Sequence, residues 1–253
     1  MTLALGLLGF VAVGIALGLL GGGGSILAVP VLVNVLGIPA STAVPMALPV
    51  VGIAAAAGAV TRWRRGELRV STVALFAACA MGASYLAARL GVGIADRPRL
   101  LLFGTIMLIA AAMMWRRASS VRNANAVPAT ARSAIQVVPV ALVVGTLTGI
   151  LGVGGGFLIV PALAGVLALP MPEATATSLA VIALNTAAAG AGYFSRHVAI
   201  DPGLTAMVTV AALVGMGIGL RIAPRYSHGT LVRAFAILLV ALAIITIGKE
   251  LVA

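Results

Sequence analysis

The segment GLLGGGGSILAVPVL, residues 18–32, and its near copy GILGVGGGFLIVPAL, residues 149–163, decide the fold of this chain. Each has a run of glycines inside a long apolar stretch, with a proline shortly after the run. Over residues 14–39, 13 of 26 positions are identical to the residues 131 positions later. Because apolar bias alone does not place glycines and prolines in register, the sequence predicts an internal duplication.

Composition places the chain in a lipid bilayer. Of its 253 residues, 62% are hydrophobic and only 8% are charged, whereas average soluble domains carry roughly 25% charged residues. Several apolar stretches approach the ~20 residues that a helix needs to cross the hydrocarbon core. They are apolar on every face and do not alternate with a period of two, which excludes a transmembrane barrel.

The basic charge follows the membrane topology. The formal charge of +11 comes from 16 Lys and Arg against five acids. The arginines gather beside hydrophobic segments, in residues 62–69, 116–132 and 221–233, as cytoplasmic loops do under the positive-inside rule. We therefore expect a multi-pass protein of the bacterial inner membrane, in contact with the lipid bilayer and without a nucleic-acid partner.

The hydrophobic runs predict an all-α membrane protein with two homologous repeats. The predicted helices cover residues 41–62, 70–90 and 99–116, then 174–194, 203–223 and 230–248, and Gly-interrupted segments at 3–36 and 135–168 open the two repeats. Residues 118–133 are polar and contain a proline, as a solvated connection would. The expected organisation is a first transmembrane repeat at 1–117, a linker at 118–133 and a second repeat at 134–253.

The length of the first segment predicts that the repeats are inverted. A helix over residues 3–36 would be about 50 Å long, too long for one crossing of a ~30 Å core, so it breaks at the glycines into a helical hairpin. A hairpin, re-entrant or fully spanning, returns to its starting side, so each repeat crosses an odd number of times. Loop charge does not decide against a parallel arrangement: the inverted one puts 11 of the 16 Lys and Arg on one face, and the parallel one puts 10 there.

The two glycine runs are candidates for an anion-binding site. Interrupted helices at membrane depth leave N–H groups that protein, water or a ligand must satisfy, and successive N–H groups at the start of a half-helix attract anions. The expected substrate-binding residues of the runs are Gly22, Gly23, Gly24, Ser25, Gly154, Gly155 and Gly156. The alternative is that the glycines only allow close helix packing.

A polar face in the second half extends this candidate site. Thr175, Ser178 and Asn185 fall within an arc of about 80° on one predicted helix, and their hydroxyl and amide donors suit a desolvated oxyanion. The counterparts in the first half are Val44, Ala47 and Ala54. The expected site is therefore asymmetric, although the same three polar side chains could instead join helices by hydrogen bonds.

We expect no metal site, no cofactor and no catalytic residue, and therefore not an enzyme. The acids Glu67, Asp96, Glu173, Asp201 and Glu250 all lie at segment ends, and the two histidines have no ligand spacing. Cys79 is the only cysteine, which excludes a multi-cysteine metal site. The lack of a carboxylate in the middle of a segment argues against cation transport.

The two glycine segments, with the helix start EATATSLAV at residue 173, resemble the sulfite exporter TauE/SafE family, also called the toluene sulfonate uptake permeases. The resemblance spans both halves. It implies a secondary transporter, a permease or exporter, for a small sulfur oxyanion or organosulfonate such as sulfite, thiosulfate or sulfoacetate. The motif does not imply which one.

We expect the two repeats to provide alternating access to a small anionic substrate by moving against one another. A coupling proton and a homo-oligomer both stay open. The rival hypothesis is a non-transporting membrane scaffold or accessory subunit, whose glycines serve packing alone. An intramembrane enzyme has the least support, because no His, Cys and acid group occurs at catalytic spacing.

Overall fold

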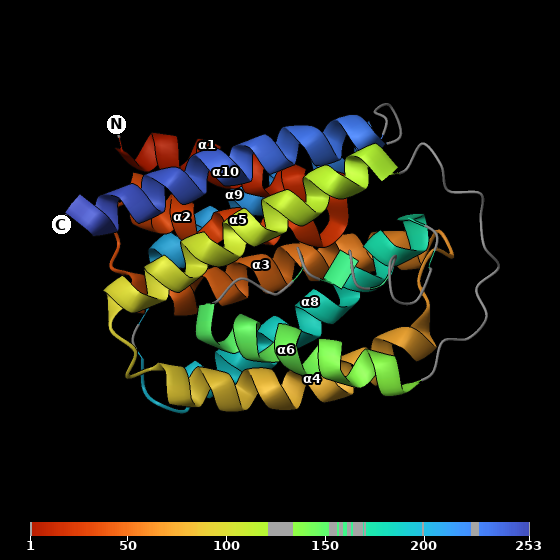
Figure 1. The fold of residues 1–253 in the computed structure, drawn as a ribbon, viewed down its shortest axis with the longest axis horizontal. Coiled ribbons are helices and arrows are strands. Elements are labelled where there is room, and N and C mark those ends of the chain that lie inside the picture. The colour runs from red at the N-terminus through yellow and green to blue at the C-terminus, as the bar shows by residue number, and fades with distance from the viewer. Residues whose placement is uncertain are drawn as a thin grey trace.

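The chain folds into a bundle of long helices that lie roughly along one direction (Figure 1). The computed structural model describes residues 2–120, 134–151, 156, 159–160, 163, 169, 171–198, 200–223 and 228–252. In this part of the chain all regular elements are helical and there is no strand. The long helices are α1 (Thr2–Leu20), α3 (Ala40–Trp63), α4 (Val70–Gly91), α5 (Asp96–Ser120), α6 (Ala134–Leu151), α8 (Met171–Phe194), α9 (Pro202–Ile222) and α10 (His228–Val252).

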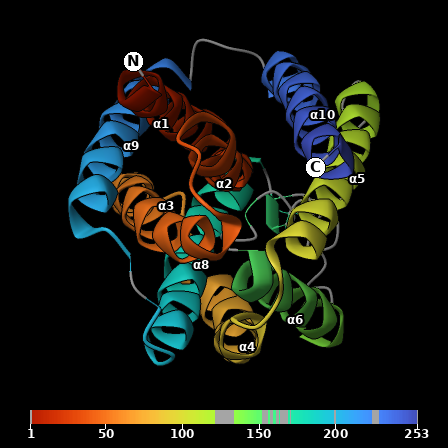
Figure 2. The same ribbon diagram turned by 90° about the vertical axis from the view of Figure 1, so that its left-hand side faces the viewer.

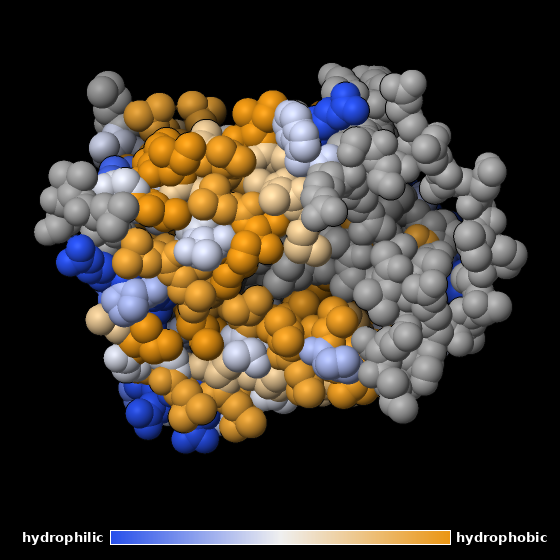
Figure 3. Space-filling model, viewed as in Figure 1, coloured by the Kyte–Doolittle hydropathy of each residue, from blue (hydrophilic) through white to orange (hydrophobic). Residues whose placement is uncertain are grey.

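Five helical segments are long and apolar enough to cross a membrane, which agrees with the expected membrane protein. They are Thr2–Val35, Ala40–Trp63, Val70–Gly91, Pro172–Phe194 and Pro202–Ile222. On the face that Figure 3 shows, hydrophobic side chains cover the middle of the bundle, and many hydrophilic ones lie at its left-hand edge. Large apolar side chains such as Leu90, which is 81% exposed, suit contact with lipid tails and not with water.

The predicted helices correspond to the observed ones within a few residues, with one extension. α5 continues to Ser120, past the predicted end at residue 116 and into the first residues of the expected linker. The rest of that linker, residues 121–133, lies outside the described residues. The second Gly-interrupted segment, predicted at 135–168, begins with the apolar helix α6. Most of its remaining residues, 152–168, also lie outside the described residues.

The first glycine run changes the direction of the chain. After α1 the backbone turns at Gly21, whose φ is +70°, a value that favours glycine. The short elements η1 (Gly21–Leu27), α2 (Ala28–Pro30) and η2 (Val31–Val35) follow. They lie back alongside α1, since a Cβ added to Gly9 would meet Val31 and one added to Gly24 would meet the backbone of Leu17.

Glycines also allow two helix pairs from opposite halves of the chain to pack closely. Gly14 and Gly18 of α1 lie against the backbone of α9, where an added Cβ would come within 2.8 Å of Leu220 N at Gly18. Gly145 and Gly149 of α6 lie in the same way against α4. In both pairs the residue numbers in contact rise together, so α1 runs parallel to α9, and α6 runs parallel to α4.

The remaining contacts complete the arrangement. α3 packs against α8, with Gly52 beside Thr186 and Gly58 beside Leu179, so these two helices are antiparallel. α5 and α10 pack mainly on one another and stand together at one side of the bundle (Figure 2). The two termini lie at one end of the bundle, called here the termini end, and α5 ends and α6 begins at the other, the linker end (Figure 1).

Candidate functional site

The two glycine runs meet inside the bundle at Gly22 and Gly156. A Cβ built on either residue would come within 2.5 Å of the other residue's Cα. Only glycine allows two backbones to approach this closely. Both residues are buried, while Gly154 and Gly155 lie outside the described residues. Backbone groups from the two halves of the chain are therefore brought into direct contact, as a shared site would need.

Helix α8 holds the first run in place through Ser178. The backbone N–H of Gly22 donates to Ser178 Oγ at 3.2 Å, and Ser178 Oγ donates to the carbonyl oxygen of Thr175 at 2.8 Å. Thr175 also packs on Gly21, where an added Cβ would lie 2.9 Å from Thr175 Cβ. The structure thus brings two of the three predicted polar side chains to the first glycine run.

The hydroxyl hydrogens of this pair are donated within α8. Thr175 Oγ1 donates to the carbonyl oxygen of Pro172 at 2.9 Å, as Ser178 does to Thr175. Ser25 Oγ donates to the carbonyl oxygen of Gly22 at 2.8 Å, which closes the first turn of η1. Such bonds to a nearby carbonyl are local, so rotation about the side-chain bond can redirect a hydroxyl to a ligand without moving the helix.

Asn185 lies two turns further along α8, about 10 Å from Ser178, and contacts other helices. Its side-chain Nδ2 donates to Thr148 Oγ1 of α6 at 2.8 Å, and its backbone carbonyl oxygen accepts from Ser84 Oγ of α4 at 2.9 Å. The side chain is 0% exposed, and its Oδ1 has no hydrogen-bond partner in the part of the chain that the structure describes. Asn185 therefore carries one unused polar atom in the interior, near the helix that precedes the second run.

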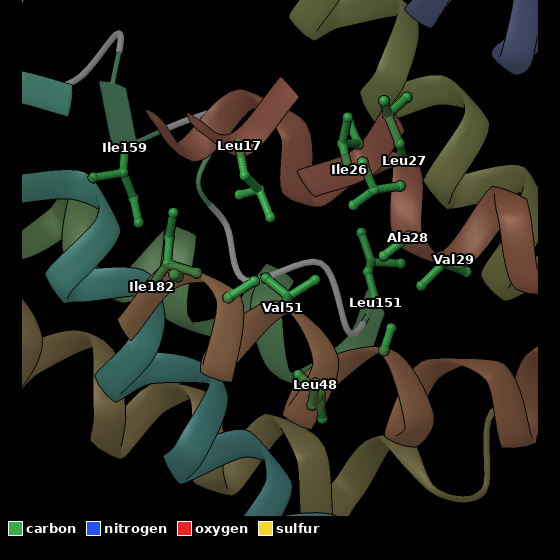
Figure 4. Packing of buried hydrophobic residues seen from close by; sticks show 14 of the residues in the cluster. Leu17, Ile26, Leu27, Ala28, Val29, Leu48, Val51, Leu151, Ile159 and Ile182 are labelled. Carbon is green, nitrogen blue, oxygen red and sulfur yellow. The ribbon is translucent and has the colours of Figure 1, made fainter. Parts of the chain in front are cut away.

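The surroundings of the runs are apolar and buried. Figure 4 shows the fully or almost fully buried side chains of Leu17, Ile26, Val51, Ile159 and Ile182 around this part of the interior. They come from both halves of the chain. In such a low-dielectric environment a hydrogen bond or an ion contact is stronger than in water, and an unpaired polar group is more costly.

Sequence reasoning placed Arg62 in a loop cluster, but the structure buries it. Arg62 is 8% exposed; it donates from Nη2 to the carbonyl oxygen of Gly18 at 3.3 Å and from Nη1 to Glu67 Oε2 at 2.9 Å. Arg69 forms an ion pair with Glu173 at the same end of the bundle. The only signal for the burial of Arg62 was that it is the last residue of the predicted helix at 41–62, and not part of the loop that follows.

The described residues contain no group of three or more His, Cys, Asp and Glu side chains that could hold a metal ion. Two apolar grooves lie on the outside of the bundle. One, about 490 Å³, runs between α3 and α8 past Gly52 and Phe194, and the other, about 600 Å³, lies between α5 and α10 beside Trp115. Their linings are almost wholly apolar, so neither suits an anion.

Comparison with known proteins agrees with this architecture. A family model described as "Sulfite exporter TauE/SafE" matches residues 5–246. A "Probable membrane transporter protein" of Xylella fastidiosa strain 9a5c is 32% identical over 242 residues, which cover 94% of this chain and 92% of the relative. A protein of the same description from strain Temecula1 is 32% identical over 241 residues, with the same two coverages. No solved structure matches the chain significantly.

Proposed function

We propose that this chain, which belongs to the sulfite exporter TauE/SafE family, is a secondary transporter for a small sulfur oxyanion or organosulfonate such as sulfite, thiosulfate or sulfoacetate. Membership of the family and the relatives make it a multi-pass bacterial membrane transporter. The observation that carries the proposed substrate class is the meeting of the two glycine runs at Gly22 and Gly156 in the buried, apolar interior.

The proposed architecture is a pair of inverted repeats, 1–117 and 134–253, joined by a linker at 118–133. Three observations support it. α1 and α6, which open the two halves, start at opposite ends of the bundle (Figure 1). α1 packs on α9 as α6 packs on α4. Of the 13 Lys and Arg among the described residues, eight belong to helix ends and loops at the linker end, which the positive-inside rule places in the cytoplasm.

The segment from Thr2 to Val35 then acts as a helical hairpin whose tip is the first glycine run. The return of residues 31–36 to the start of α1 supports a hairpin that crosses the bilayer twice, since Leu36 lies against Gly6. At the tip, Gly18 lies beside Arg62 of α3, one residue before the end of that helix. The second half would place its own run in the same way, from the opposite side of the membrane.

The proposed binding groups are the backbone of both runs and the polar face of α8. They are the seven residues Gly22, Gly23, Gly24, Ser25, Gly154, Gly155 and Gly156, with Thr175, Ser178 and Asn185. An oxyanion that enters between the runs would accept hydrogen bonds from the Gly22 N–H and the Ser178 hydroxyl. Without it, the Gly22 N–H donates to the Ser178 oxygen. Two hydrogen bonds, from the Gly22 N–H to Ser178 Oγ and from the Ser178 hydroxyl to the carbonyl oxygen of Thr175, would be exchanged for two charge-assisted ones, which are stronger and favour the bound anion.

Alternating access would come from movement of one repeat against the other about the Gly22–Gly156 contact. The glycine-lined contacts between α1 and α9 and between α4 and α6 suit such movement, because small residues allow helices to slide past one another. Each repeat holds the first helix of the other through these pairs. A displacement of one repeat would therefore move the tip of the other repeat's hairpin.

The rival function, a scaffold or accessory subunit, draws on the tightness of the same contact. If the glycines serve packing alone, the hydroxyl bonds within α8 are purely structural. The experiment that separates the two is flux of sulfite, thiosulfate and sulfoacetate, with chloride for comparison, into proteoliposomes at equal amounts of folded protein. An arm with an imposed pH gradient detects a coupling proton.

We expect saturable uptake of at least one sulfur anion, and a loss of at least about tenfold in Ser178→Ala. The matched control is Ser71→Ala, the same substitution at an exposed position of α4, which should transport as the wild type does. Folded protein without saturable flux of any panel anion would leave the scaffold as the better account.

A further inference from the structure

The first turn of α5 contains a buried guanidinium that the proposed transport site does not use. Arg99 is 2% exposed and lies near the start of α5, at the termini end of the bundle and opposite the end that holds Arg62. Its Nη2 donates to the carbonyl oxygen of Gly91 at 2.6 Å. Its Nε and Nη1 have no hydrogen-bond partner among the described residues.

The carboxylate nearest to Arg99 is too far away to form a hydrogen bond with its guanidinium. The nearest carboxylate oxygen is Asp96 Oδ1, 3.9 Å from Nη1, and the side chain of Asp96 is 38% exposed. Arg62, by contrast, has a carboxylate partner at 2.9 Å. Because a guanidinium keeps its charge in proteins, and because a buried charge without full pairing is costly, Arg99 has an unmet demand for a negative partner.

A second donor stands next to this guanidinium. Tyr193 is 1% exposed and donates its hydroxyl to the carbonyl oxygen of Ile150 at 3.4 Å, a long hydrogen bond. A Cβ built on Gly91 would lie 3.7 Å from the Tyr193 hydroxyl, so Arg99 and Tyr193 both flank Gly91. Ile150 comes two residues before the second glycine run. The pair therefore lies between the termini end and that run.

We infer that Arg99 and Tyr193 form a second anion-binding site, at the termini end, which takes a small oxyanion of the sulfonate or sulfite class. Three donors of two kinds are at hand there: two guanidinium nitrogens and a phenol hydroxyl that makes only a long bond. Planar guanidinium donors match the oxygens of such anions. The site's place on the transport route rests on the proposed function, whereas the binding itself does not.

The test is a thermal-shift titration of the purified full chain with sodium methanesulfonate and sodium sulfite, against sodium chloride at equal ionic strength. A ligand that binds the folded state raises the melting temperature by mass action. We expect a saturable rise for the wild type, an apparent affinity at least tenfold weaker in Arg99→Gln, and an intermediate affinity in Arg99→Lys. Tyr193→Phe should weaken it less than Arg99→Gln does.

The matched control is Arg97→Gln, which removes the same charge from the same turn of α5 at an exposed position and should keep the wild-type response. An unchanged affinity in folded Arg99→Gln, or no response of the wild type to either probe, would overturn the inference. A phosphate headgroup is the competing source of the same chemistry. If phosphatidylglycerol but not methanesulfonate stabilises the protein through Arg99, the site belongs to lipid and the inference is wrong.

Flux distinguishes this failure from failure of the transport proposal. Saturable flux with no Arg99-dependent binding overturns the second site alone, while Arg99-dependent binding without flux overturns transport alone. If both stand, Arg99→Gln should raise KM for anions presented at the termini end, without the same rise for anions presented at the linker end.

Discussion

Helices α3 and α8 occupy equivalent places in the two halves of the chain and pack against one another, yet their chemistry differs. At an offset of 131 residues, Ala47 of α3 corresponds to Ser178 of α8, and Arg62 corresponds to Tyr193. Ser178 accepts the N–H of the first glycine run, and Ala47 has no group that could do the same for the second. Of these two helices, α8 thus carries the hydroxyl group that contacts the first glycine run.

The two halves of the chain therefore contribute different groups to this contact. The first half contributes the backbone N–H of Gly22, and the second half contributes the Ser178 hydroxyl oxygen that accepts from it. At the two ends of the bundle, Arg62 and Tyr193 each donate to a carbonyl at the end of the first helix of their own repeat, Gly18 and Ile150. Only the linker end pairs its buried arginine closely with an acid.

The largest loss of stability is expected at the contact between Gly22 and Gly156, to which each half of the chain contributes a glycine. In Gly22→Ala the new methyl group would fall on the backbone of Gly156, and overpacking of this kind costs about 3 kcal/mol. Denaturant unfolding in detergent measures the loss of free energy of unfolding. Gly82→Ala, at an exposed helix position where an added Cβ meets nothing within 4 Å, should be neutral or stabilising by up to about 1 kcal/mol.

Equal stability of Gly22→Ala and Gly82→Ala would contradict the close contact between the two runs. The sequence predicts that the two runs face each other in one site, but not which of their residues meet. The glycine runs, their register and the helices around them follow from residue types and spacing, because glycine and proline interrupt helices locally. That Gly22 meets Gly156 depends on how segments more than 130 residues apart pack, and no local pattern contains that information.

The second prediction breaks the bond that differs between α3 and α8. Ser178→Ala leaves the buried N–H of Gly22 without its acceptor, at a cost of about 2 kcal/mol in the free energy of unfolding. The reverse change in the other repeat, Ala47→Ser, should cost less than about 1 kcal/mol, because a helical serine can donate to its own backbone. If Ser178→Ala and Ala47→Ser lost equal free energy of unfolding, the Gly22–Ser178 hydrogen bond would not contribute to stability as proposed.

The third prediction adds charge to the polar face of α8. Asn185→Asp keeps the shape of a 0% exposed side chain but gives it a carboxyl group, which opposes an anion in a low-dielectric site. Anion flux in proteoliposomes should fall about tenfold, equivalent to about 1.4 kcal/mol. Asn34→Asp changes a residue that bonds to Thr246 away from the glycine runs, and its flux should stay near the wild-type value.

If both Asn→Asp variants transport equally well, Asn185 lies off the path and serves to join α8 to α6. The sequence predicts that Asn185 shares one helix face with Ser178 and Thr175, and the helix α8 over Met171–Phe194 agrees with this. Hydrogen bonds between helices were the alternative expected for this face, but the partner, Thr148, could not be predicted, since the neighbour of a helix face is decided by tertiary packing. The burial of Arg99 also depends on tertiary packing and was not predicted. From the sequence alone, a guanidinium near a helix start is expected to be solvated.

The smallest effect concerns the next pair of equivalent helices, α4 and α9. Asp201 caps α9 by accepting from the N–H groups of Gly203 and Leu204 at 2.9 and 3.1 Å, whereas Arg69 before α4 makes no side-chain cap. Asp201→Ala should therefore cost about 1 kcal/mol in the free energy of unfolding, and Asp201→Ser should restore most of it. An Asp201→Ser variant as unstable as Asp201→Ala would point to a role for the charge instead of the cap.

The most direct test of the account gives α8 the chemistry of α3. The triple variant Thr175→Val, Ser178→Ala and Asn185→Ala installs the first repeat's residues on the second repeat's helix, with few atoms added or lost. Sulfite and sulfoacetate flux is then measured in proteoliposomes, at amounts of folded protein matched by circular dichroism. The account predicts that saturable flux disappears in this variant; flux with the wild-type KM and maximal rate would contradict it.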